Sequence, residues 1–81
     1  MSLRSLIVSE FESVASERKQ ELAKLSDDLV LVDSGLDSLS FAVIVARLED
    51  QLGVDPFSSS DAPFPVTLRE FIVAYETAQA A

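Results

Sequence analysis

Apolar residues recur every three or four positions along three stretches of the chain, and this spacing predicts three amphipathic α-helices. The first helix is expected from about Ser2 to Arg18, the second over residues 38–52, and the third from Thr67 to about Ala78. A residue whose side chain can cap a helix stands at the start of each stretch, which supports these boundaries.

The segments between the predicted helices carry turn-forming residues. Residues 26–37 are rich in Asp, Ser and Gly and are expected to form a long ordered loop. Four apolar residues are candidates to pin this loop onto the core: Leu29, Leu31, Val32 and Leu36. Gly53 ends the second helix, and residues 57–62 are expected to form one short helical turn before Pro63 and Pro65. No stretch alternates with period two, so the predicted fold is all-α, a small four-helix bundle of three main helices plus a short third helix.

The second predicted helix is apolar on two sides. One side is a sufficient core face, formed by Phe41, Ile44, Val45, Leu48 and Leu52. We expect Phe41 and Leu48 to meet Phe11 and Phe71 where the helices cross. The other side carries an apolar strip that acidic residues prolong: Leu39, Ala42, Val43, Ala46, Glu49 and Asp50. Because a chain this short cannot bury every side of one helix, the strip is predicted to be a docking surface for partner proteins, unless the loop or the short helix covers it.

Length and charge narrow the class of protein. The 81 residues are expected to form one domain, residues 1–81. The net charge is −8, and residues 27–61 hold eight acids against one base, a sum of −7. This acidic middle would repel nucleic acid and anionic lipid, and it would attract basic protein surfaces.

The residue inventory argues against an independent enzyme. The chain has no His and no Cys, which excludes Ser-His and Cys-His nucleophile pairs and metal sites built on His or Cys. We therefore expect no catalytic residue and no metal site. The longest apolar run, residues 41–46, is far shorter than the roughly 18 residues of a membrane span, and the N-terminus lacks a signal-peptide layout. The expected location is the cytoplasm.

One short motif carries the functional information. Residues 33–39 contain Asp33, Gly35, Asp37, Ser38 and Leu39 in the order Asp-x-Gly-x-Asp-Ser-Leu. This motif resembles the phosphopantetheine attachment motif of acyl carrier proteins, and the resemblance covers essentially the whole chain. The serine also opens a predicted helix after a long loop, where an attached phosphate would lie at the positive end of the helix dipole.

The resemblance implies an acyl-carrier fold and a covalent 4′-phosphopantetheine arm joined to Ser38 by a phosphodiester. A phosphopantetheinyl transferase would attach the arm from coenzyme A with Mg²⁺, recognising Asp37, Leu39, Gly35 and Asp33. The thiol of the arm would hold acyl intermediates as thioesters in fatty acid or polyketide biosynthesis. Partners would include an adenylating ligase and acyltransferase or condensing enzymes, and the carrier would be a stand-alone monomer.

The second helix departs from carriers of primary fatty acid synthesis, which tend to have more acids there. Ser40, Phe41 and Val43 occupy its first two turns, and Arg47 follows. These departures favour a specialised pathway. Two other functions stay open: an aminoacyl or peptidyl carrier loaded by an adenylating ligase, and an acidic helical adaptor whose Ser38 is never modified.

Overall fold

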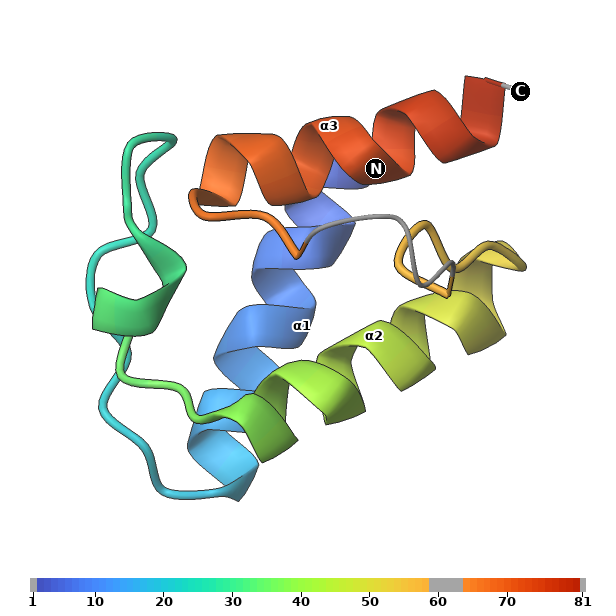
Figure 1. Cartoon of the computed structure of the whole chain (residues 1–81). Coiled ribbons are helices and arrows are strands. Elements are labelled where there is room, and N and C mark those ends of the chain that lie inside the picture. The colour runs from blue at the N-terminus through green and yellow to red at the C-terminus, as the bar shows by residue number, and fades with distance from the viewer. Residues whose placement is uncertain (1, 59–63, 81) are drawn as a thin grey trace.

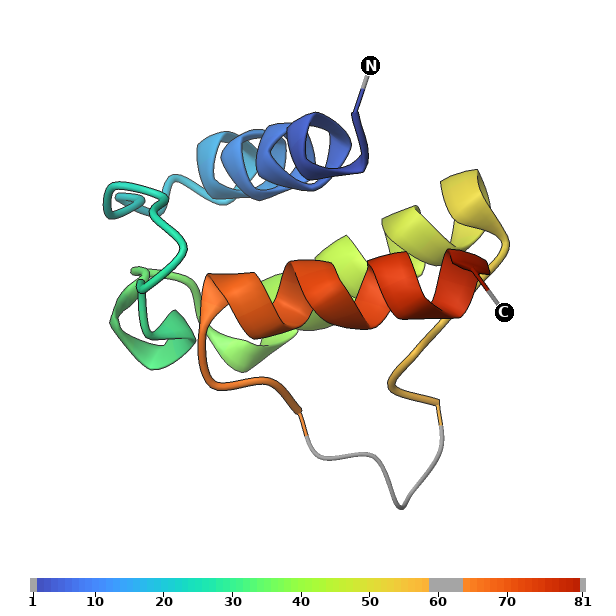
Figure 2. The same ribbon diagram turned by 90° about the horizontal axis from the view of Figure 1, so that it is seen from above.

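Three α-helices and one short 3₁₀ helix make up the described part of the chain (Figure 1). The computed structural model describes residues 2–58 and 64–80. The elements are α1 (Leu3–Glu17), the 3₁₀ helix η1 (Leu31–Asp33), α2 (Ser38–Leu52) and α3 (Leu68–Ala80). The prediction of an all-α fold is confirmed, and α2 has the predicted bounds. Helix α1 packs against both α2 and α3, and Figure 2 shows it on one side of that pair.

The helix ends follow local capping chemistry. Ser2 caps α1 by accepting a hydrogen bond from the backbone N–H of Ser5 at 3.1 Å. Gly53 ends α2 at φ +74°, the left-handed conformation that glycine adopts without a steric cost. Thr67 and Glu70 form the predicted capping box before α3: each side chain accepts a hydrogen bond from the other residue's backbone N–H.

The core lies where the three helices meet, around the ring of Phe11. Phe41 and Phe71 contact this ring edge-on, with centroid distances of 5.9 and 5.3 Å. Phe11, Phe41, Leu48 and Phe71 are all buried, as predicted. Ile44 is buried with them, whereas Val45 and Leu52 are partly buried at the edge of the core. The predicted core face of α2 is therefore confirmed.

The long loop before α2 is held by backbone pairing with the segment that leads into α3. Leu31 N–H donates to the Val66 carbonyl at 2.8 Å, and Leu68 N–H donates to the Leu29 carbonyl at 3.0 Å. The pairing includes one antiparallel bridge, between Val30 and Thr67. This bridge has no period-two signal in the sequence, because a single bridge has no alternation to detect.

The apolar side chains of this loop divide between core and surface. Leu31 and Leu36 are buried in the core, as predicted. The prediction that Val32 pins the loop is wrong, because its side chain is 84% exposed. Its position within η1 explains this: the backbone turn that buries Leu31 directs the next residue outward.

The predicted short helix falls largely outside the described residues. Before it, Asp55 starts a turn in which its side chain accepts a hydrogen bond from the Phe57 N–H at 2.9 Å. Of the predicted turn, only Phe57 and Ser58 are described, and both belong to the segment that follows α2. No helix in the described ranges is long and apolar enough to cross a membrane.

Two leucines of α2 provide a matched test of the core. Leu48 is fully buried, whereas Leu39 is 57% exposed on the same helix. Leu48→Ala is expected to lower the free energy of unfolding by about 2–5 kcal/mol, because it leaves a cavity, and Leu39→Ala by less than about 1 kcal/mol. Urea unfolding of both variants measures this difference. Equal losses would contradict the assignment of the core face.

Candidate modification site at the start of helix α2

Ser38 is the first residue of α2, and its side chain is exposed. Asp37 is the N-cap: its Oδ1 accepts a hydrogen bond from the Ser40 backbone N–H at 2.8 Å. The hydroxyl of Ser38 therefore stands at the positive end of the helix dipole, which stabilises an attached anionic group. An accessible hydroxyl in this position is suited to carrying a phosphodiester.

The Asp37 carboxylate makes further contacts with the end of α1. Its Oδ2 accepts from Arg18 Nη2 at 3.2 Å and from Gln20 Nε2 at 3.0 Å. The pKa of Asp37 is lowered to about 2, chiefly by the hydrogen bond from the Ser40 backbone, with contributions from Gln20 and Arg18. Asp37 is thus charged at neutral pH, and both of its oxygens have partners.

Gly35 occupies a position that no other residue fits. Its φ is +94°, and a Cβ there would collide with the backbone carbonyl oxygen of Glu21. The residues before α2 therefore lie directly against the chain that leaves α1. The contact with Glu21 could not be predicted from the sequence, because the two residues are distant along the chain.

Ser34 is a structural residue that sequence reasoning missed. It is fully buried, and its Oγ donates to the Leu31 carbonyl at 2.6 Å and accepts from Leu36 N–H at 3.3 Å. Its own carbonyl accepts from Ala23 N–H at 2.8 Å. Ser40, two residues after Ser38, is also fully buried. Of the three serines at positions 34, 38 and 40, Ser38 alone is exposed.

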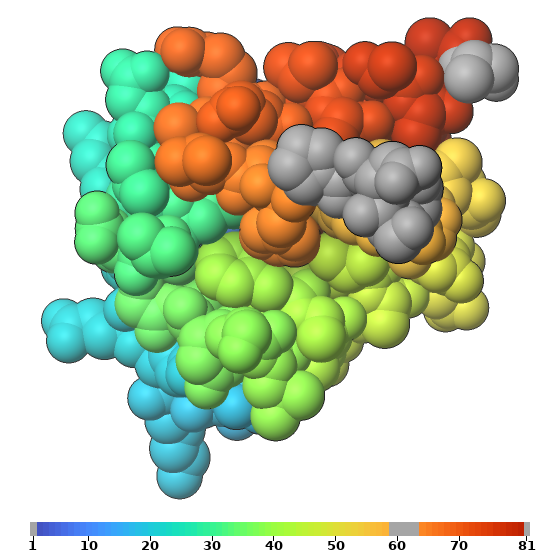
Figure 3. Space-filling model, viewed as in Figure 1, coloured from blue at the N-terminus to red at the C-terminus, as the bar shows by residue number. Residues whose placement is uncertain are grey.

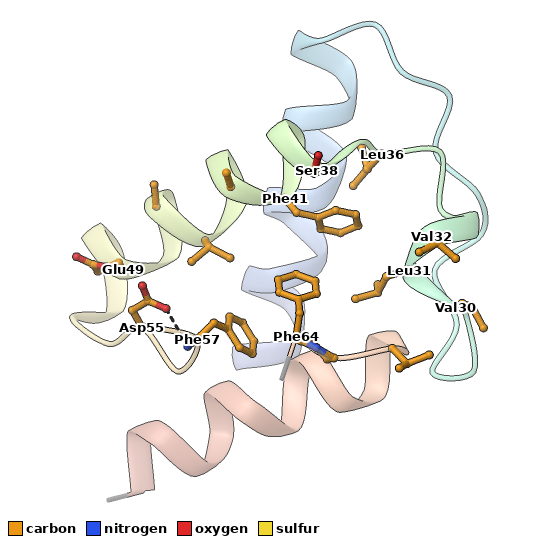
Figure 4. A pocket seen from close by; sticks show the side chains of 15 residues that line it. Val30, Leu31, Val32, Leu36, Ser38, Phe41, Glu49, Asp55, Phe57 and Phe64 are labelled. Atoms are coloured by element: carbon orange, nitrogen blue, oxygen red, sulfur yellow. Dashed lines mark hydrogen bonds between the residues drawn. The ribbon is translucent and has the colours of Figure 1, made fainter. Parts of the chain in front are cut away.

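An apolar groove of about 980 Å³ opens beside Ser38. Figure 4 shows Phe41, Phe57 and Phe64 in this groove, with Ser38 near one end and Glu49 and Asp55 near the other. Its remaining walls are mostly aliphatic: Val30, Leu31, Val32, Leu36, Ala42, Val45, Ala46, Pro65 and Val66. Small side chains at positions 42 and 46 are the sequence signal that could have indicated a hollow along α2.

The predicted docking strip is only partly exposed. Leu39, Ala42, Ala46, Glu49 and Asp50 are exposed, and Figure 3 shows the first half of α2 at the surface. Val43 is half-buried and packs against the core, so its membership of an open strip is corrected. We use "docking strip" below for the five exposed residues.

Arg47 does not interrupt the acidic surface of α2. Its guanidinium makes two hydrogen bonds to the Glu17 carboxylate, at 2.8 and 2.6 Å, and it lies 3.9 Å from Glu10. The pKa of Glu17 is lowered chiefly by this hydrogen bonding. Because Arg47 pairs with acids of α1, its charge is offset there, and the docking strip keeps its negative end.

Comparison with known proteins identifies the family. The family model of the phosphopantetheine attachment site matches residues 5–61 of the sequence, and the chain belongs to this family of carrier domains. It is 41% identical over 54 residues, 67% of its length, to the non-reducing polyketide synthase CTB1 of Cercospora nicotianae, of which it covers 2%. It is also 41% identical over 66 residues, 76% of its length, to the non-reducing polyketide synthase VdtA of Byssochlamys spectabilis, of which it covers 3%. No solved structure gives a significant match.

Members of this family carry 4′-phosphopantetheine covalently, and the residues at the start of α2 fit that group. Ser38 offers an exposed hydroxyl at a helix N-terminus, and Arg18 pairs with the carboxylate next to it. When bound, the group supplies a thiol that holds cargo as a thioester, a function the chain cannot supply because it has no Cys.

The lowered pKa of Asp37 predicts a pH dependence of stability. Between the folded pKa of about 2 and the ordinary value of 3.8, the unfolded chain binds more protons, so stability is lost as pH falls through this window. Asp37→Asn keeps a capping side chain without the charge and is expected to flatten this part of the profile. Urea unfolding across pH 2–5 measures both proteins, and parallel profiles would contradict the account.

Proposed function

We propose that this chain is a carrier that holds acyl intermediates as thioesters on a 4′-phosphopantetheine arm attached to Ser38. It presents them to partner enzymes and is not itself an enzyme. The observation that carries the proposal is the exposed Ser38 at the first position of α2, capped by Asp37 and adjacent to the groove. The family match supports the carrier role independently of this geometry.

The surroundings of Ser38 support a carrier more than a catalyst. The chain has no His, and both oxygens of the neighbouring Asp37 already accept hydrogen bonds. Among the described residues, the carboxylate next to Ser38 is thus already hydrogen-bonded, and its lowered pKa makes it a weak base for the Ser38 hydroxyl. A separate phosphopantetheinyl transferase would have to activate it, with coenzyme A as the donor of the arm.

The groove supports a cargo with apolar surface. It begins beside Ser38, where the arm would be attached, and Phe41, Phe57 and Phe64 line it. A cargo on a flexible arm could fold back into the groove and bury its apolar atoms there, which is favourable in water. The similarity to non-reducing polyketide synthases favours a polyketide or another specialised acyl group as cargo. An amino acid or peptide remains the alternative cargo.

The docking strip is our proposed contact for partners, among them an adenylating ligase, an acyltransferase or a condensing enzyme. Leu39 is the one large apolar side chain of α2 that is exposed, and Glu49 and Asp50 extend the strip with charge. Basic side chains of a partner would be steered by these acids, whereas apolar contacts at Leu39 would set the residence time. A monomeric, cytoplasmic carrier, with residues 1–81 forming one domain, remains our prediction.

Intact mass tests the attachment directly. After incubation with coenzyme A, Mg²⁺ and a broad-specificity phosphopantetheinyl transferase, the wild-type protein is expected to gain one phosphopantetheine mass. Ser38→Ala is expected to gain none while remaining folded, because Ser38 is exposed and Asp37 still caps α2. An unmodified wild-type protein would instead favour the acidic adaptor, and a modified Ser38→Ala would place the arm elsewhere.

A salt series tests the docking strip, again with the transferase as the partner. Glu49→Lys is expected to raise the KM for the carrier mainly at low salt, because screening weakens charge contacts. Leu39→Ser is expected to raise it at every salt concentration.

The matched control is Glu76→Lys, which makes the same charge change at an exposed position of α3. If Glu49→Lys and Leu39→Ser both keep the wild-type KM across the salt series, or if Glu76→Lys raises KM as much as Glu49→Lys does, the strip is not the docking surface.

A further inference from the structure

Three residues outside the Ser38 motif form a hydrogen-bonded network with Asp37. Arg18 and Gln20 donate to Asp37 Oδ2 at 3.2 and 3.0 Å, and the Ser40 backbone N–H donates to Oδ1 at 2.8 Å. The hydroxyl of Ser40 donates to Gln20 Oε1, so both ends of the Gln20 amide have a partner. Ser40 is fully buried and Gln20 is half-buried, so the two bonds that Ser40 makes are partly buried, whereas the bonds from Arg18 and Gln20 to Asp37 are exposed.

The turn that ends α1 delivers the two donors. Lys19 adopts a left-handed conformation at φ +56°, and its N–H donates to the Ser16 carbonyl at 3.2 Å. Gln20 N–H donates to the Ala15 carbonyl at 2.8 Å, which completes a Schellman motif. This tight turn sends the chain from α1 toward the start of α2, and the side chains before and after Lys19 both reach Asp37.

The network also bears on the charge beside Ser38. An arm attached there adds a phosphodiester anion next to the Asp37 carboxylate, and two like charges so close repel each other. Arg18 forms an ion pair with that carboxylate and offsets part of the repulsion. The same contacts keep Asp37 in the capping position, so the first turn of α2 is formed before any partner binds.

We propose that Arg18 and Gln20 are positioning residues for the modification of Ser38: they hold Asp37 as the N-cap, so the transferase meets Ser38 on an already formed helix. This inference rests on the proposed function. Without the two donors, a smaller fraction of the carrier has an ordered start of α2. The apparent affinity for the transferase falls in proportion to that fraction.

The test uses Arg18→Gln and Gln20→Glu, which remove different donors to Asp37. Steady-state transfer from coenzyme A by a broad-specificity transferase is expected to show a KM raised by up to about fivefold, because loss of a typical N-cap shifts the equilibrium at the start of α2 by about that factor, with kcat nearly unchanged. The pKa of the Asp37 carboxyl, measured by NMR, should rise from about 2 toward its ordinary value. Arg18→Lys keeps the charge, so its KM should lie between those of the wild type and Arg18→Gln.

The control is Arg4→Gln, which removes the ion pair between Arg4 and Asp27 at the other end of α1. It changes the net charge as Arg18→Gln does and should leave both KM and the pKa of Asp37 at their wild-type values. Melting curves confirm that each variant is folded at the assay temperature, and two variants keep the test decisive if one fails to fold.

The outcomes separate this inference from the proposed function. A wild-type protein that the transferase does not modify overturns the proposed function itself. A wild-type protein that is modified, with folded Arg18→Gln and Gln20→Glu variants at wild-type KM, overturns the positioning role alone. An equal rise of KM in Arg4→Gln would show a general effect of charge and would also overturn it.

Discussion

The hydrogen bond from the Ser40 backbone N–H to Asp37 Oδ1 determines where α2 begins, and the rest of the site depends on it. A shift of the helix by one residue in its packing against the core would rotate every side chain by about 100° relative to that core. With Asp37 as the cap, Phe41, Ile44 and Leu48 face the core, and Ser38 lies at the exposed first position. One local interaction therefore sets both the packing of the helix and the accessibility of its serine.

The two apolar sides of α2 have different roles. The core side packs against Phe11 of α1, whose ring also contacts Phe71 of α3, so one aromatic side chain joins all three helices. The neighbouring side carries small residues, Ala42 and Ala46, and these form one wall of the groove. Large side chains from other segments form the opposite wall. An unfilled groove leaves apolar surface exposed to water, which stabilises the fold less than full burial would. The same exposed surface is available to a cargo beside the attachment point.

The local features of this structure could be predicted from the sequence, and the long-range features could not. The bounds of α2 and its Gly53 end follow from residues within one turn of each other. By contrast, three features depend on segments that are distant in sequence or irregular in structure. They are the contact of Gly35 with Glu21, the burial of the Ser34 hydroxyl, and the hydrogen bonds from Arg18 and Gln20 to Asp37. The error at Val43 has the same origin, because the packing of other segments decides whether its side chain is exposed to water. The error at Val32 comes instead from the turn of η1.

Peptide-level mass spectrometry tests the central claim that the capped start of α2 presents one serine for modification. Ser34, Ser38 and Ser40 lie within seven residues of each other, and Ser34 and Ser40 are fully buried. After transfer from coenzyme A, fragmentation of the peptide that contains all three should place the phosphopantetheine on Ser38. An arm on Ser34 or Ser40 would contradict the account, because either site would require the start of α2 to be rearranged.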